Sequence, residues 1–149
     1  MEWIILFVVS WILFVFLVDW KEIKLNIWCG VLAVGLQLSI DTSAMTHKFY
    51  KVNNGILNVW GSSLFFILGP VLVIGILLAQ FHPEKRWMRT INVFIIAALY
   101  SLQELLLFYT EVLAYINWNF TDSVVVNIAA MVILSWFSIV VLKKGAGER

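Results

Sequence analysis

The sequence predicts an all-α integral membrane protein, a bundle of five transmembrane helices. Of its 149 residues, 62% are hydrophobic and 13% are charged, about half the charged share of an average soluble domain. A soluble domain of this size hides only about 70% of the surface that its unfolded chain exposes. So much apolar surface therefore requires lipid as its surroundings. The apolar residues also fall into five separate runs, which supports one helix for each run.

Each run is close to the length that a helix needs to cross about 30 Å of hydrocarbon. We predict spans over residues 3–18, 25–40, 60–81, 91–116 and 124–142. The first two are short, about 24 Å at 1.5 Å per residue, so they cross fully only if flanking residues extend them. We expect all five to be helical, since open strand edges do not occur in lipid. The chain is predicted to form one domain over residues 1–149.

The basic residues predict the orientation of the bundle. Eight of the ten basic residues fall in the first loop, the third loop and the C-terminal tail: Lys21, Lys24, Lys85, Arg86, Arg89, Lys143, Lys144 and Arg149. Each of these segments follows an odd number of predicted spans, so all three lie on the same side of the membrane. The other side has only Lys48 and Lys51. Because Lys and Arg accumulate in cytoplasmic loops, we expect the N-terminus outside and the C-terminus in the cytoplasm.

Residues at the predicted boundaries agree with this orientation. Trp3, Trp60 and Trp118 fall at outer boundaries, where indoles with one wet end collect. At the inner side, lipid headgroups are the expected contacts of four residues: Lys85, Arg86, Trp87 and Arg89.

A polar stripe on the fourth span is the candidate site. Glu104 lies near the middle of that span, where a charged side chain costs about 2.5–3.5 kcal/mol, so we expect it to face the protein interior. Helical spacing predicts one stripe of four residues: Tyr100, Glu104, Glu111 and Tyr115. The expected hydrogen-bond partner of Glu104 is Gln37 or Asn127. Asp41 is predicted to lie outside the spans.

The sequence leaves three functions open. In the first, the polar stripe is a hydrogen-bond cluster that holds the bundle of a structural or accessory membrane subunit together. In the alternative, Glu104 and Glu111 form a polar path in a small transporter, channel or ligand-binding protein. Polar residues inward of Glu104 are sparse on the fourth span, which favours the first. A third, a lipid-modifying enzyme, would use His82 and Glu84 at the inner headgroup level.

The sequence lacks the signatures of common catalytic and metal sites. It contains no HExxH or GxSxG motif and no glycine-rich phosphate loop, so an enzyme is disfavoured and no catalytic residue is assigned. The two histidines, His47 and His82, are predicted on opposite sides of the membrane, and no metal site is expected. A net charge of +1 predicts no nucleic-acid partner. The expected partners are the lipid bilayer and either another membrane protein or a second copy of the chain.

Two further predictions concern the outer segment between the second and third spans and the third span itself. In the outer segment 41–61, Met45, Phe49, Val52 and Ile56 recur at helical spacing, which suggests a short helix on the membrane surface. A solvated loop is the alternative. In the third span, Pro70 after Gly69 predicts a kink, since proline removes a backbone donor.

Several short motifs resemble a family of small multi-pass membrane proteins of endospore-forming bacteria. They span nearly the whole chain: Asp19-Trp20-Lys21, Gly69-Pro70, His82-Pro83-Glu84-Lys85, Glu104, Asn117-Trp118-Asn119, Asn127, Met131 and Lys143-Lys144. The proline-rich opening of the second span expected in that family is missing here. The resemblance implies the bacterial cytoplasmic membrane and a spore-related role, and it implies no catalytic residue.

Overall fold

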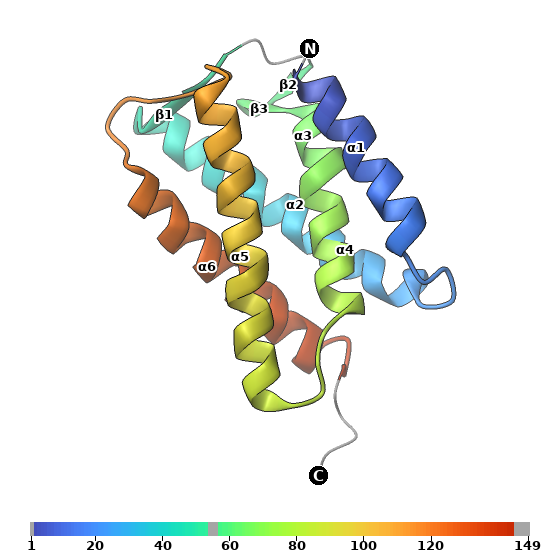
Figure 1. The fold of residues 1–149 in the computed structure, drawn as a ribbon. Coiled ribbons are helices and arrows are strands. Elements are labelled where there is room, and N and C mark those ends of the chain that lie inside the picture. Colours follow the sequence, from blue (N-terminus) through green and yellow to red (C-terminus); the bar gives the residue numbers. More distant parts are fainter. Residues whose placement is uncertain (1, 54–56, 145–149) are drawn as a thin grey trace.

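The structure, a computed structural model, describes residues 2–53 and 57–144. It is mostly helical, as Figure 1 shows. The helices are α1 (Glu2–Leu17), α2 (Ile23–Thr46), α3 (Leu64–Phe66), α4 (Leu72–Gln80), α5 (Arg86–Tyr109) and α6 (Phe120–Val140). A π-helical turn, η1 (Ile67–Val71), joins α3 to α4, and we call the continuous helix Leu64–Gln80 the rod.

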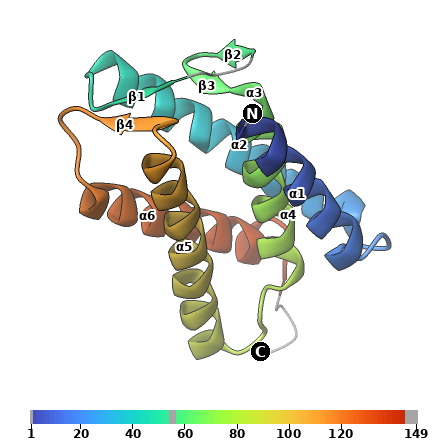
Figure 2. The same ribbon diagram turned by 45° about the horizontal axis from the view of Figure 1, so that its top comes forward.

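Short strands gather at one end of the bundle, where α5 ends and α6 begins (Figures 1 and 2). Strand β1 (Tyr50–Val52) pairs antiparallel with β4 (Leu113–Tyr115), and β2 (Asn58–Val59) pairs antiparallel with β3 (Ser62–Ser63). We call this the strand end of the bundle. The prediction of a surface helix over segment 41–61 is wrong for Val52, because this residue lies in strand β1. Ile56 lies outside the described residues.

Within the described ranges, three helices are long and apolar enough to cross a membrane: α2, α5 and α6. Helix α1 and the rod are apolar but shorter. The outward surfaces of the bundle are apolar too, since Phe16, Leu99 and Val125 are 82%, 61% and 61% exposed. A helix on the surface of a soluble protein instead turns a polar face outward. The predicted helical bundle with membrane-spanning helices is confirmed to this extent.

Helix α5 ends seven residues before the predicted boundary at Ile116, because the backbone leaves the helix at Glu111. Glu111 adopts a positive φ of 59°. Its N–H donates to Phe108 O at 3.1 Å, and the N–H of Val112 donates to Leu107 O at 3.1 Å. This pair of bonds is the Schellman motif, which satisfies the last carbonyls of a helix. The apolar run beyond it forms β4 instead of a further helical turn.

Helix α2 runs past its predicted end at Ile40 to Thr46 and stops by the same motif. Lys48 has a φ of 55°. The N–H of Phe49 donates to Ala44 O at 2.8 Å, and that of Lys48 to Met45 O at 3.1 Å. The additional turns carry Asp41 into the packed part of the bundle, where it is 3% exposed. Its predicted position outside the second span is therefore wrong, since the helix Ile23–Thr46 contains it.

Small residues bring α2 against the rod. A Cβ atom added to Gly75 would lie 2.7 Å from Ala33 Cβ and 3.0 Å from Cys29 O, so only glycine fits there. The predicted kink at Pro70 takes the form of the π-helical turn, which lets the rod continue through the proline. Close to this turn, the indole N–H of Trp11 in α1 donates to Leu68 O at 3.1 Å.

Candidate functional site

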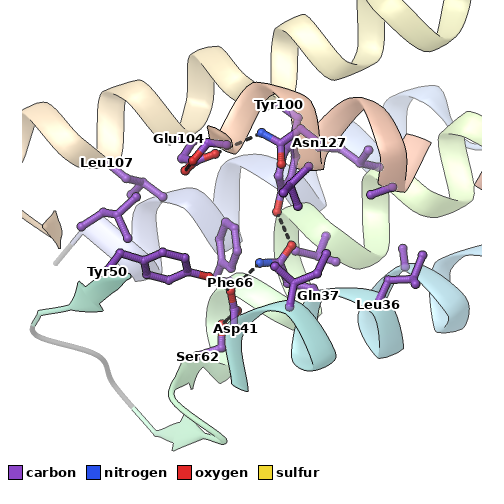
Figure 3. Close-up of a pocket in the computed structure, with 18 of the residues that line it drawn as sticks. Leu36, Gln37, Asp41, Tyr50, Ser62, Phe66, Tyr100, Glu104, Leu107 and Asn127 are labelled. Atoms are coloured by element: carbon purple, nitrogen blue, oxygen red, sulfur yellow. Dashed lines mark hydrogen bonds between the residues drawn. The ribbon is translucent and has the colours of Figure 1, made fainter. Parts of the chain in front are cut away.

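A cavity of about 80 Å³ lies at the strand end of the bundle. Its walls come from every helix and from β1, β3 and β4, and they are mainly apolar. Besides Trp3, the polar side chains that line it are Gln37, Asp41, Tyr50, Ser62, Tyr100, Glu104, Trp118, Ser123 and Asn127. Figure 3 shows most of them converging from α2, α5, α6 and the strands. They form two groups, each centred on one carboxylate.

The first group, the Asp41 cluster, consists of Asp41, Gln37, Tyr50 and Ser62. Gln37 Nε2 donates to Asp41 Oδ1 at 2.8 Å. The hydroxyl of Tyr50 donates to the same oxygen, and the hydroxyl of Ser62 donates to Oδ2. Tyr100 of α5 extends the cluster by donating from its hydroxyl to Gln37 Oε1 at 2.8 Å (Figure 3). Three separate segments therefore hold one buried carboxylate.

The second group, the Glu104 cluster, consists of Glu104, Tyr115, Ser123 and Asn127. Tyr115 and Ser123 donate from their hydroxyls to Glu104 Oε1 at 2.9 and 2.6 Å. Asn127 Nδ2 donates to Oε2 at 3.0 Å. Trp118 supports the cluster through its indole N–H, which donates to Ser123 Oγ at 2.7 Å. Glu104 thus also accepts three hydrogen bonds.

The tyrosine hydroxyls remain hydrogen-bond donors at neutral pH. Burial raises the pKa of Tyr50, and the charges of Asp41 and Glu104 raise that pKa further. Burial also raises the pKa of Tyr115 to about 12, with the neighbouring charge of Glu104 acting in the same direction. Both phenols therefore stay protonated and can keep donating to the carboxylates.

The structure separates the four residues of the predicted stripe. Tyr100 and Glu104 lie on α5 and line the cavity, as expected. The placement of Glu111 and Tyr115 on the same helix face is wrong, because α5 ends at Tyr109. Glu111 is exposed in the turn after the helix. Tyr115 returns to Glu104 from β4, so it reaches the carboxylate by strand pairing and not by helical spacing.

The two residues proposed as partners of Glu104 have different roles. Asn127 donates to Glu104, which confirms one of the two expected contacts. Gln37 instead bridges Tyr100 and Asp41. Both amides line the same cavity as Glu104.

Sequence reasoning missed Asp41 and Trp3 as members of the site. A signal for Asp41 was present, since it follows Gln37 by four residues and so lies on the same face of α2. Trp3 was predicted at an outer boundary, with one end of its indole in water. It is instead 2% exposed and lines the cavity, and its indole nitrogen has no hydrogen-bond partner among the described residues.

The opposite end of the bundle carries the residues expected to contact lipid headgroups. Lys85, Arg86 and Trp87 are exposed there, whereas Arg89 is half-buried and donates to Pro83 O at 2.8 Å and Glu84 O at 2.5 Å. Burial, and then the positive charges of Arg89 and Lys144, lower the pKa of His82.

No group of three or more His, Cys, Asp or Glu residues within 2–53 and 57–144 is placed to hold a metal ion. Comparisons with protein families, with curated proteins and with solved structures find no match to this chain.

Proposed function

We propose that this chain is a polytopic membrane protein that binds a small ligand in the cavity at the strand end. The observation that carries the proposal is the presence of two carboxylates, Asp41 and Glu104, in one cavity whose described lining includes no lysine, arginine or histidine. Buried carboxylates are normally paired with a cation or a metal. A ligand that enters the cavity would supply the missing partner, as in the transporter, channel or ligand-binding alternative.

The proposal includes a membrane arrangement. Five spans, with α1 and the rod completed by flanking residues, would put the strand end outside and the basic end in the cytoplasm. The cavity would then belong to the outer half of the bilayer. The resemblance to membrane proteins of endospore-forming bacteria supports the bacterial cytoplasmic membrane and a spore-related role as parts of this proposal.

Chemical access to the cavity tests the proposed function. Ala130 lines the cavity, whereas the neighbouring Ala129 is exposed on the outside of α6. In a chain with Cys29→Ala, we expect Ala130→Cys to react with a small cationic thiol reagent faster than with an anionic one. Ala129→Cys is the matched control and should show no preference for the cation. If neither reagent modifies Ala130→Cys in the folded protein, the cavity admits no solute and the ligand-binding function is wrong.

The second candidate is a structural or accessory membrane subunit, and one observation favours it. Each carboxylate accepts three hydrogen bonds from the protein itself. Together with the bond from Tyr100 to Gln37, the clusters therefore join α2, α5 and α6 without a ligand. Interhelical hydrogen bonds of this kind contribute about 0.6–2 kcal/mol each. If Ala130→Cys reacts with neither thiol reagent, the structural or accessory function becomes the better proposal.

A further inference from the structure

We infer, on the basis of the proposed ligand-binding function, that the ligand is a small organic ammonium ion with N–H donors and a nearby oxygen acceptor. An amino alcohol has this chemistry, and so does the aminoethyl headgroup of a membrane lipid. Four features of the cavity support the inference: its charge, the unused lone pairs of its carboxylates, its aromatic walls and one unpaired indole.

The charge of the cavity calls for a cation. Asp41 and Glu104 both line it, and the residues described in its wall include no basic side chain. Their six hydrogen-bond partners all donate, which is the pattern that suits ionised carboxylates, since these only accept. Two ionised carboxylates in a mainly apolar cavity are costly without a positive charge nearby.

Each carboxylate also has room for one more donor. An ionised carboxylate offers about four lone-pair sites. Three are used on Asp41 and three on Glu104, and the single bonds to Asp41 Oδ2 and Glu104 Oε2 leave the free site on those two oxygens. An ammonium group with N–H donors would fill such a site and neutralise the charge at the same time.

Aromatic rings line the same space. Trp3 packs against Phe66 with ring centroids 5.8 Å apart, and Phe66 against Tyr100 at 6.2 Å. Tyr50 and Trp118 form another pair at 6.3 Å. Aromatic faces attract organic cations, and the attraction is stronger when the site is desolvated. A bare metal ion would gain nothing from the apolar walls, whereas the carbon atoms of an organic cation would pack against them.

Trp3 supplies the argument for an oxygen on the ligand. Its side chain is 2% exposed, it lines the cavity, and its indole N–H meets no acceptor among the residues described. Buried donors without a partner are rare, because each loses its hydrogen bonds to water and gains none in return. A hydroxyl or ester oxygen on the ligand would accept this bond. A cavity of about 80 Å³ is several times the roughly 10–15 Å³ that one water molecule needs, so it has room for a ligand of a few non-hydrogen atoms.

Titration with 2-aminoethanol tests the inference. The protein is placed in nanodiscs of phosphatidylglycerol, which has no amine, and binding is measured by ligand-detected NMR. A ligand of four non-hydrogen atoms reaches at best about 40 μM, so the titration extends to millimolar concentrations. We expect 2-aminoethanol, as its ammonium ion, to bind at least about tenfold more tightly than 1-propanol, its neutral counterpart of the same shape. This comparison uses the unmodified protein and needs no variant to fold.

Variants assign the binding to the cavity. Asp41→Asn and Glu104→Gln should each weaken 2-aminoethanol binding at least about tenfold. Glu111→Gln, which neutralises an exposed acid in the turn after α5, should leave binding unchanged. Trp3→Phe should weaken the binding of 2-aminoethanol but not of propylammonium, which lacks the hydroxyl.

Two results would overturn the ligand class. One is equal binding of 1-propanol and 2-aminoethanol, and the other is full displacement of 2-aminoethanol by sodium at the same concentration. Either result, combined with a reactive Ala130→Cys, would reject the ammonium ligand and keep the proposed ligand-binding function. Nanodiscs that contain phosphatidylethanolamine distinguish the two sources of the ammonium group, a lipid headgroup and a free amine. Retention of that lipid, with loss of 2-aminoethanol binding, supports a headgroup ligand, and unchanged 2-aminoethanol binding supports a free amine.

Discussion

Glu104 illustrates how one carboxylate joins distant segments of this chain. Its three donors come from β4, from the first turn of α6 and from the next turn of α6: Tyr115, Ser123 and Asn127. Because an acceptor shared in this way satisfies three groups, its loss affects more than one contact. The energetic effect therefore depends on whether the replacement can still accept hydrogen bonds.

We expect Glu104→Ala to lower the free energy of unfolding by about 1–3 kcal/mol, because buried donors lose their acceptor. Glu104→Gln keeps the shape and one carbonyl oxygen, so its loss should be less than about 1 kcal/mol. Denaturant or thermal unfolding in detergent micelles measures both. Equal losses for the two variants would show that the hydrogen bonds of Glu104 do not stabilise the bundle.

His82 should make the stability of the protein depend on pH. Burial and the charges of Arg89 and Lys144 lower its pKa in the folded state, whereas the unfolded chain has a pKa of about 6.5. As pH falls through this range the unfolded state binds more protons, so stability decreases. We expect the melting temperature to fall between pH 7.5 and pH 5.

His82→Gln is the control, since glutamine does not titrate. The decrease in melting temperature over this pH range should be smaller in this variant than in the unmodified protein. An identical decrease in the two proteins would assign the pH dependence to other groups.

At the scale of elements, the helix ends decide which residues reach the cavity. The residues after α5 are as apolar as those inside it, so composition and hydropathy place no boundary at Tyr109. The boundary comes from the positive φ of Glu111 and from the pairing of β4 with β1. Helical periodicity predicts neither of these features. At Glu111, and likewise at Lys48 after α2, the residue with positive φ is not the glycine that usually marks a helix end.

The contact between α2 and the rod gives an element-scale prediction. Gly75→Ala should destabilise the protein by about 1–3 kcal/mol, since the new Cβ would lie 2.7 Å from Ala33 Cβ and 2.8 Å from Gly30 Cα. Gly35→Ala is the matched control in α2, because nothing lies within 4 Å of its added Cβ. That control should be neutral or stabilising by up to about 1 kcal/mol. Equal unfolding midpoints of the two variants would contradict the close packing of α2 against the rod.

At the scale of the whole molecule, the two ends of the bundle differ in chemistry. The strand end holds the two carboxylate clusters, and the opposite end holds Lys85 and the first turn of α5 with Arg86 and Arg89. Lys144 near the C-terminus forms an ion pair with Glu22 at 2.5 Å, which ties α6 to the start of α2 at this end. Such an asymmetry is what the accumulation of Lys and Arg on the cytoplasmic side would produce.

Single cysteines test the proposed orientation. In a Cys29→Ala chain, we expect Lys48→Cys in intact cells to react with a membrane-impermeant maleimide. Lys85→Cys should react only after the membrane is permeabilised. The reverse labelling pattern would invert the bundle. Labelling of both positions in intact cells would show that the rod does not cross the membrane and would contradict five spans.

The sequence alone determined the helical class of this protein and the inward direction of Glu104, and it limited the expected partner of Glu104 to Gln37 or Asn127. These follow from apolar content, from the cost of a charge in lipid and from helical spacing, all of which are local properties. Only the tertiary structure decided that Asp41 and Trp3 join the same cavity and that Tyr115 reaches Glu104 from a strand. Those contacts depend on where helices end and how loops pair, and the energies that set them come from residues far apart in the chain.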